Sequence, residues 1–247
     1  MTITLLARST QIHRRCAATL LLAVIFVGFF ADTVTAHPLG NFTINHFARL
    51  EVGAERVRVR FVVDMAEIPA FQELQTVKAD GDAAPSSAAL KEYLEHIVPQ
   101  YANGLVLSID GERIQLQSVA KAISLPPGAG GLPTLRVECD LAGTMPFSRL
   151  STGEHLVRFE NINHSNRLGW HELIVVPAVG VSIYNSTAFG NASTDELRGY
   201  PADMLAAPLD ERIAEMSFTQ AVIPSELLLC GRAIIAPRFS RATGWVS

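Results

Sequence analysis

The fold is decided by residues 44–63, which read INHFARLEVGAERVRVRFVV. In the first half, alternate positions form a mostly apolar set: Ile44, His46, Ala48, Leu50 and Val52. In the second half, valine and phenylalanine alternate with arginine after a short turn over residues 53–55. Two runs of period two around a glycine-containing turn predict a β-hairpin with one apolar face. His46 lies on the same side of the strand as these apolar residues, so we expect it to face the core or a pocket beside the core.

The segment after this hairpin carries two carboxylates, Asp64 and Glu67, that allow two interpretations. Their spacing of three matches a capping box in which aspartate takes the place of serine or threonine as the N-cap of a helix. On this interpretation both side chains serve a helix that begins here. On the other, one of them is a metal ligand, or supports a metal ligand, near residue 37.

A second helix is expected over residues 88–101, because five apolar side chains recur there with helical spacing: Leu90, Tyr93, Leu94, Ile97 and Val98. Ser86 or Ser87 would cap its start. Pro99 would limit its end, because proline has no backbone N–H to donate. The polar segment 78–87 ahead of this helix is interpreted as a linker.

Further strands are expected at intervals along the chain. A second hairpin is predicted around the tight turn Asp110-Gly111, and single strands follow it. The expected strand ranges are 105–109, 114–119, 132–141, 155–161, 173–176, 180–186 and 205–219. Together with the first hairpin they predict a mainly β (α+β) domain, an antiparallel β-sandwich-like pair of sheets with two inserted helices.

Composition excludes some classes of protein. With 49% hydrophobic and 18% charged residues, the chain has the composition of a globular protein. The net charge is −4, and it becomes −6 when residues 1–36, which hold three arginines and one aspartate, are left out. Nucleic acid is therefore not an expected partner, since a phosphate-binding surface needs a basic face. Cys139 and Cys230 remain after residue 36, and the sequence leaves their pairing open.

Residues 1–36 have the layout of a signal peptide. Basic residues at 13–15 precede an apolar core over 19–31, and the small residues Val34 and Ala36 stand where a signal peptidase reads them. This core is shorter than the roughly 20 apolar residues of a membrane span. We expect cleavage after Ala36 and an exported, periplasmic domain over 37–220. An uncleaved signal anchor over 17–36 is the alternative, with the domain on the outer face of the cytoplasmic membrane.

Residues 221–247 lack the periodicity of the preceding domain, and we interpret them as an irregular, aberrant tail.

Cleavage after Ala36 would make His37 the first residue of the mature chain. A terminal histidine offers a metal ion its α-amine and its ring Nδ1 together. The ordinary pKa values of about 7.7–8.0 and about 6.5 allow a divalent ion to displace both protons near neutral pH. Pro38 has no backbone N–H to deprotonate, which excludes a square-planar site built from the amides of residues two and three. The pair would therefore need further ligands from the folded domain.

Three strings of residues resemble a known family: HPLGNFTINHF from residue 37, RLEV followed by RVRVRFVVDMAEIPAFQE from residue 49, and NRLGWHEL from residue 166. They resemble the extracytoplasmic N-terminal region of bacterial nickel/cobalt transporters of the NicO type, and the resemblance runs from about His37 to about Gln220. Those transporters continue into a bundle of membrane helices, which this chain does not show. The resemblance implies the exported head of such a transporter, truncated before the permease part.

The candidate metal ligands are His37, His46, Asp64 and His164. His37 is the leading one, because its amine and its ring can act together. His164 belongs to a polar loop over 161–172 that also holds His171. In the resembling family lysine also occurs at the position of His171, which implies that His171 stabilises the loop instead of binding metal. No catalytic constellation is present, so we expect no enzyme activity.

Three functions remain open at this point. The first is a head domain that captures Ni²⁺ or Co²⁺ and works beside a membrane permease. The second is a free-standing periplasmic copper-binding protein, because amine and imidazole ligands hold Cu²⁺ more tightly than Ni²⁺. The third is a structural or interaction module whose histidines only pack.

Overall fold

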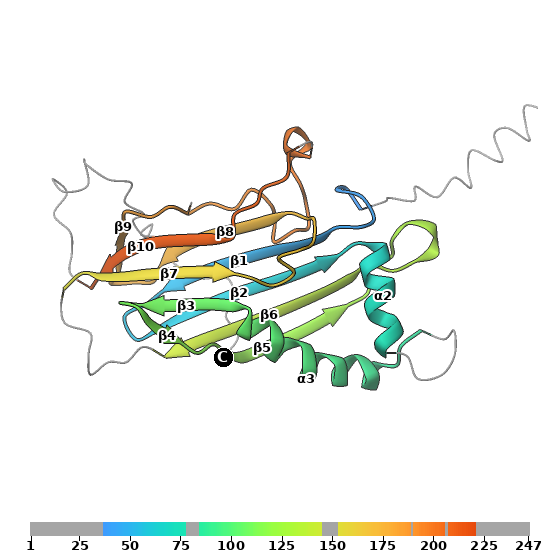
Figure 1. The fold of residues 1–247 in the computed structure, drawn as a ribbon, viewed down its shortest axis with the longest axis horizontal. Helices are drawn as coiled ribbons and strands as arrows, with labels where there is room; N and C mark the ends of the chain where they lie inside the picture. Colours follow the sequence, from blue (N-terminus) through green and yellow to red (C-terminus); the bar gives the residue numbers. More distant parts are fainter. Residues whose placement is uncertain (1–36, 78–83, 145–152, 189, 206, 221–247) are drawn as a thin grey trace, which may run out of the picture. The chain divides into compact units, whose positions relative to one another are not determined.

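The computed structural model describes residues 37–77, 84–144, 153–188, 190–205 and 207–220. The predicted signal peptide (1–36), the predicted tail (221–247) with Cys230, and most of the predicted linker over 78–87 lie outside these ranges. The described residues form two five-stranded β-sheets and two α-helices (Figure 1). This confirms the predicted mainly β, sandwich-like fold with two inserted helices.

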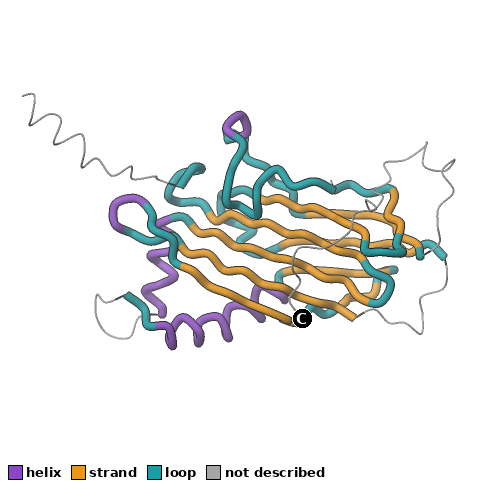
Figure 2. The backbone as a smooth tube through the Cα atoms, turned by 180° about the vertical axis from the view of Figure 1, so that it is seen from behind, coloured by secondary structure: helices purple, strands orange, loops and turns teal. Residues whose placement is uncertain are grey.

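The first layer, here called sheet A, has the strand order β5-β6-β2-β1-β8. Seen from behind, its strands run side by side (Figure 2). The neighbours in this sheet are antiparallel except β1 and β8, which are parallel, so sheet A is mixed where a purely antiparallel sheet was expected. Its members are β1 (Ile44–Val52), β2 (Arg56–Met65), β5 (Gln117–Ser124), β6 (Leu135–Thr144) and β8 (His171–Pro177).

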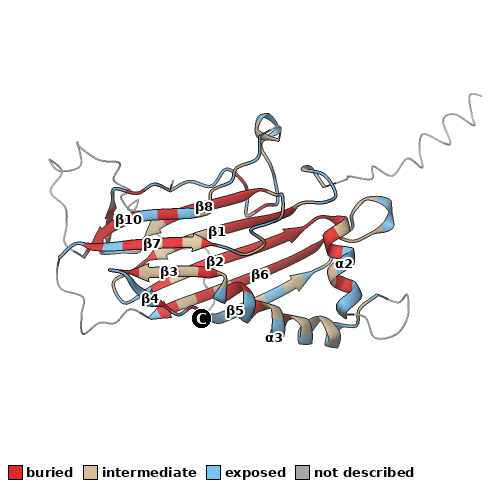
Figure 3. Cartoon of the chain, in the orientation of Figure 1, coloured by how far each residue is buried: buried red, intermediate tan, exposed pale blue. Residues whose placement is uncertain are grey.

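The second layer, here called sheet B, has the strand order β4-β3-β7-β10-β9 and is antiparallel. Side chains from the facing surfaces of both sheets form one apolar core, and the buried stretches follow the strands in Figure 3. The members of sheet B are β3 (Leu105–Ile109), β4 (Glu112–Ile114), β7 (His155–Asn161), β9 (Ser182–Tyr184) and β10 (Ile213–Thr219).

The first hairpin forms as its alternation predicts. β1 and β2 pair from Ile44 opposite Met65 to Val52 opposite Val57, and the predicted apolar set of β1, His46 included, is buried. On the other face of β1, the first two side chains, Asn45 and Phe47, are also buried. A second apolar cluster covers this outer face of sheet A, and its buried members are Phe47, Val62, Trp170, Ile174 and Leu197.

The capping role predicted for Asp64 is wrong. Asp64 belongs to β2, where it pairs with Asn45, and the helix α2 spans Glu67–Val77. No side-chain cap is needed, because the N–H groups of Ala66 and Ile68 donate to carbonyl oxygens of residues 43 and 41. The chain before β1 therefore supplies the acceptors that a capping box would have supplied.

The helix α3 (Ser87–Asn103) confirms that the predicted row of apolar side chains lies on one face of a helix. It does not end at Pro99, as the sequence predicts. Ser86 caps it by accepting from the Ala89 N–H. Pro99 lies inside the helix on an exposed position, and the helix continues for another turn. The buried side chains on either side of Pro99, Val98 and Tyr101, keep the helix packed although proline removes one backbone hydrogen bond.

The strand expected over 114–119 is divided between the two sheets. β4 ends at Ile114 in sheet B, and β5 begins at Gln117 at the edge of sheet A. The Asp110-Gly111 turn forms as expected, with φ of 51° and 82°. Cys139 is a free, buried thiol within the described part of the chain.

Candidate metal centre

The segment that leads into β1 positions His37. A turn closes where the Gly40 N–H donates to the His37 carbonyl oxygen, and Gly40 has a φ of +91°, which favours glycine. The chain then runs past the start of α2, where its carbonyl oxygens at residues 41 and 43 accept from the N–H groups of Ile68 and Ala66, and it enters β1 at Ile44. His37 is therefore held beside the end of β2 and the start of α2.

The His37 ring is bonded to two residues of the β1–β2 hairpin. Its Nε2 lies 2.8 Å from Oδ2 of Asp64 and 3.2 Å from Nδ2 of Asn45. Its side chain is only 5% exposed. Asn45 and Asp64 are opposite each other in the register of β1 and β2, so both project from the outer face of sheet A toward this ring.

These contacts assign the tautomer of His37. A carboxylate can only accept, so the ring nitrogen facing Asp64 carries the proton and donates it. The Asn45 amide does not need Nε2 as an acceptor, since it also donates to Thr43 Oγ1 and to the Asp64 carbonyl oxygen. Nδ1 is then the unprotonated nitrogen, and it accepts from the Leu39 N–H at 3.5 Å. A carboxylate behind one nitrogen of a histidine, with the other nitrogen unprotonated, is the usual arrangement around metal-binding histidines.

The other two predicted ligands, His46 and His164, meet in the interior of the sandwich. His46 Nε2 lies 3.0 Å from His164 Nδ1, and His46 Nδ1 lies 3.0 Å from the side-chain nitrogen of Asn161. The ring of His171 stands edge-on to His46, with 4.7 Å between the ring centroids. His171 is opposite His46 in the parallel pairing of β8 with β1. Three histidines therefore cluster at one end of the core.

The pKa values of these three histidines are lowered, so their rings are neutral at pH 7. Burial is the main cause for each, and it places the pKa of His46 well below the ordinary range, where the neighbouring histidines depress it further. Burial and Arg212 lower the pKa of His171 to about 4. His171 Nδ1 lies 3.2 Å from Asp210, but among the described residues neither of its ring nitrogens makes a well-directed hydrogen bond.

The structure therefore separates the four predicted ligands into two pairs. His37 and Asp64 lie on the outer face of sheet A, and His46 and His164 lie on its inner face. The reason is local: Asn45 contacts His37 and His46 contacts His164, and consecutive residues of a strand point to opposite faces. A joint site of His37 with His46 is not formed. Among the described residues, no three His, Cys, Asp or Glu side chains are arranged to hold a metal ion.

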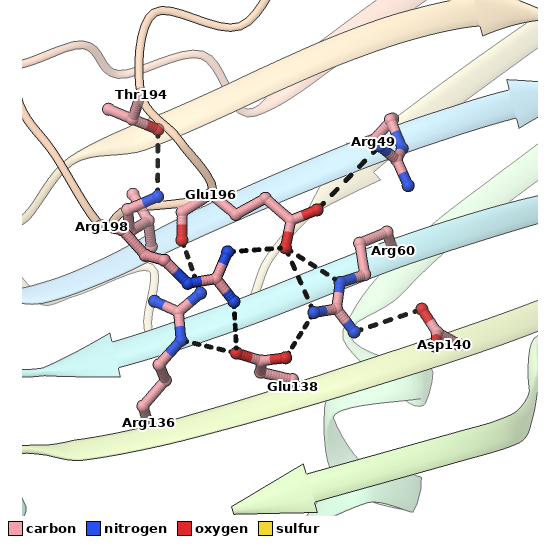
Figure 4. A network of polar contacts seen from close by, with 9 residues as sticks. Arg49, Arg60, Arg136, Glu138, Asp140, Thr194, Glu196 and Arg198 are labelled. Carbon is pink, nitrogen blue, oxygen red and sulfur yellow. Dashed lines mark hydrogen bonds and ion pairs between the residues drawn. The ribbon is translucent and has the colours of Figure 1, made fainter. Parts of the chain in front are cut away.

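Residues 190–205 cover the outer face of sheet A and reach the His37 pair. A network of charged side chains holds this segment on the sheet (Figure 4). The Arg60 guanidinium donates to Glu196 at 3.1 Å and also bonds Glu138. Arg136 donates to Glu138 at 2.7 Å and to the Glu196 carbonyl oxygen at 2.6 Å. These ion pairs bridge β2 and β6 to the covering segment.

Tyr200 comes from this covering segment and completes the surroundings of His37. Its ring stands edge-on to both His37 and Trp170, at centroid distances of 5.8 Å and 5.5 Å. Burial, followed by the charge of Asp64, raises the pKa of Tyr200 well above its ordinary range. Neither Asn45 nor Tyr200 was expected at the site. The alternation of β1 places Asn45 on the face opposite to His46, and this pattern could have indicated its position beside His37. Tyr200 is brought to the site by packing between distant parts of the chain, which no local pattern indicates.

Comparison with known proteins adds no assignment: no family model matches the chain, and no curated protein matches it significantly. The resemblance to nickel/cobalt transporters therefore stays a prediction. In the part of the chain that the structure describes, no helix has the length and apolar character of a membrane span.

Proposed function

We propose that this chain is an exported domain that captures a divalent metal ion, Ni²⁺ or Co²⁺, as the extracytoplasmic part of a nickel/cobalt transport system with a membrane permease. The metal is held by the α-amine and the ring Nδ1 of His37 after cleavage behind Ala36. The observation that carries the proposal is the 2.8 Å contact between His37 Nε2 and Asp64. It leaves Nδ1, the nitrogen that closes a chelate with the amine, unprotonated.

The surroundings of His37 support this role. Asp64 orients the ring and increases the basicity of its other nitrogen, as carboxylates do behind metal-binding histidines. Asn45 and Tyr200 restrict the ring from two further directions. A ligand held in its binding orientation loses less conformational entropy when the metal arrives.

The test is calorimetric titration of the processed chain, beginning at His37, with Ni²⁺, Co²⁺ and Cu²⁺. A twin with one extra residue ahead of His37 is titrated beside it, together with His37→Ala. His96→Ala serves as the matched control, because His96 is an exposed histidine of α3. We expect one ion per chain, loss of binding in the twin and in His37→Ala, and no change in the control. Equal binding by the twin would exclude the α-amine as a ligand.

A free-standing copper-binding protein is the second candidate, because the same ligands bind Cu²⁺ more tightly than Ni²⁺ in an unselective site. A higher affinity for Cu²⁺ than for Ni²⁺ in the titration does not identify the metal that the protein captures, because both candidate functions predict this order. Metal analysis of the protein isolated from its exporting host after growth with all three ions separates them. Absence of binding in every titration would leave a module whose histidines only pack.

A further inference from the structure

We propose that the end of the sandwich at which β1 begins docks onto the surface of a phospholipid bilayer, with the side chains of Phe42 and Leu168 inserted among the lipids. This inference goes beyond the proposed function and does not depend on metal binding. It rests on where exposed apolar side chains gather and on the charge of the loops that carry them.

Three loops form this end of the sandwich and are here called the apolar tip: residues 37–43, 125–134 and 162–170. The Ile44 N–H donates to the Leu168 carbonyl oxygen at 3.0 Å, which joins the first loop to the third. The Ala129 N–H of the second loop donates to Glu67, at the start of α2, at 2.7 Å. The first loop also bonds the start of α2. Figure 1 shows the start of β1, α2 and the β5–β6 loop at the same end of the sheets.

Large apolar side chains are exposed at this end. Phe42 in the first loop is 66% exposed, and Leu168 in the third loop is 82% exposed. Ile162, in the same loop as Leu168, and Phe71 on α2 are exposed as well. Eight large apolar side chains are exposed in the described part of the chain, and these are four of them. Such a concentration at one end is typical of an interaction surface, because exposed apolar residues are otherwise scattered singly.

The apolar tip has no acidic side chains. Its three loops contain no aspartate or glutamate, and apart from histidine their one charged residue is Arg167. The turns at the other end of the sheets differ, with Glu55 and Arg56 after β1 and Glu112 after β3. Residues 37–247 carry a net charge of −6, so anionic lipids repel most of the protein surface. This repulsion is weakest at the apolar tip.

A bilayer fits this surface better than a protein partner. A standard protein–protein interface is a continuous patch of about 800 Å² on each partner. Here the exposed side chains stand on separate loops and on α2, where each can enter a bilayer by itself to a depth of about 5–10 Å. Arg167, next to Leu168 in the chain, would then place its charge at the level of the lipid phosphates.

The sequence before the domain points to the same occupant. The apolar core over 19–31 belongs to the predicted signal peptide, which enters the membrane during export, and it is joined to the domain at His37. His37 is the first residue of the apolar tip, so the domain leaves the export pathway with this end toward the bilayer. Docking there would keep the proposed metal site at the membrane in which a permease is embedded.

The test is flotation of the processed chain, beginning at His37, with vesicles of equal parts phosphatidylcholine and phosphatidylglycerol. A chelator is present throughout, so that no metal ion bridges protein and lipid. Phe42→Ser combined with Leu168→Ser removes the inserted side chains. Leu156→Ser combined with Val179→Ser is the matched control, because both are exposed apolar residues outside the apolar tip. We expect the partition coefficient to fall at least about tenfold in the first double variant and to stay the same in the second.

A second measurement does not rely on lost binding. An environment-sensitive fluorophore is attached to Leu168→Cys in a Cys230→Ser background, in which Cys139 is a buried thiol. We expect its emission to shift to shorter wavelength when vesicles are added, and the same label on Val179→Cys to show no shift. Equal emission with and without vesicles at both positions contradicts the inference.

The outcomes distinguish the occupants of this surface. Absence of vesicle binding by the processed chain overturns the inference, and so does equal binding by the two double variants. A dimer in sedimentation experiments that is lost in Phe42→Ser with Leu168→Ser, without vesicle binding, also overturns it and assigns the apolar tip to a second copy of the chain. None of these results bears on metal capture, which the calorimetric titration tests separately.

Discussion

At the scale of single residues, carboxylates define the surroundings of His37 and of the segment that covers it. Asp64 determines which His37 nitrogen is unprotonated, and Glu172 holds the covering segment against sheet A. Both are buried acids whose oxygens contact donors of the folded chain, so neutralising either of them alters a buried polar contact. The two predictions at this scale concern these carboxylates.

Asp64→Asn is expected to weaken Ni²⁺ binding about tenfold while the fold is kept. The asparagine oxygen still accepts from Nε2–H, but without the negative charge Nδ1 is less basic. Calorimetric titration measures the change, and Asp203→Asn, at an exposed position, is the control. An affinity equal to that of the unmodified protein would show that Asp64 does not act on the ring.

Glu172→Gln is expected to destabilise the domain by about 1–3 kcal/mol. The Glu172 carboxylate is 2% exposed and accepts from the N–H groups of Ser193 and Thr194, from the Thr194 hydroxyl and from the Trp170 indole. A glutamine amide would point two N–H groups at these donors. Urea unfolding measures the loss, with Glu92→Gln on the exposed face of α3 as the control. Equal unfolding midpoints for the two variants would contradict the prediction.

At the scale of elements, the periodicity of apolar residues predicts the buried face of a strand or helix when that element packs through one face. The β1–β2 hairpin and the apolar row of α3 are examples, because alternation or helical spacing alone selects the buried side. Local signals fail where an element meets another part of the chain. Asp64 stays in a strand because β6 pairs with β2 as far as Met65, and a short turn after Ile114 moves the chain from sheet B to sheet A.

Pro99→Ala tests how α3 tolerates an interior proline. Alanine restores the N–H that proline lacks, and Pro99 is exposed, so packing is not disturbed. The gain of helix propensity outweighs the added flexibility of the unfolded chain, and we expect about 1–2 kcal/mol of added stability. Urea unfolding gives the value. A loss of stability would mean that the proline sets a bend on which the burial of Tyr101 depends.

At the scale of the whole molecule, the histidine cluster joins distant parts of the chain in one buried group. His46 comes from β1, His171 from β8, and His164 from the loop that joins β7 to β8. All three have pKa values below the ordinary value of histidine. The folded state therefore resists protonation that the unfolded chain accepts.

This cluster makes stability depend on pH in a defined window. Because the folded pKa values are lowered, the unfolded state binds more protons below pH 6.5, and stability is lost as pH falls from about 6.5 toward about 4. For His171 alone the loss is on the order of 2–3 kcal/mol. Urea unfolding between pH 7.5 and pH 5 measures it, before most carboxylates titrate.

The control for the pH dependence uses two histidine variants. His171→Gln is expected to flatten the slope, and His96→Gln, at an exposed position, is expected to keep it. A slope that stays the same in His171→Gln would mean that His171 is not a source of the pH dependence.

Local patterns in the sequence predict the hairpin, the inward position of His46, the apolar row of α3 and the mainly β class, because period and turn chemistry act over a few neighbouring residues. Which candidate residues meet depends on the packing of the two sheets. It placed His37 with Asp64 on one face of sheet A and His46 with His164 and His171 on the other, and it laid Tyr200 over the first group. The physical reason is that these contacts join residues far apart in the chain, such as Asn45 and Trp170 at 125 positions, and depend on which sheet surfaces bury each other.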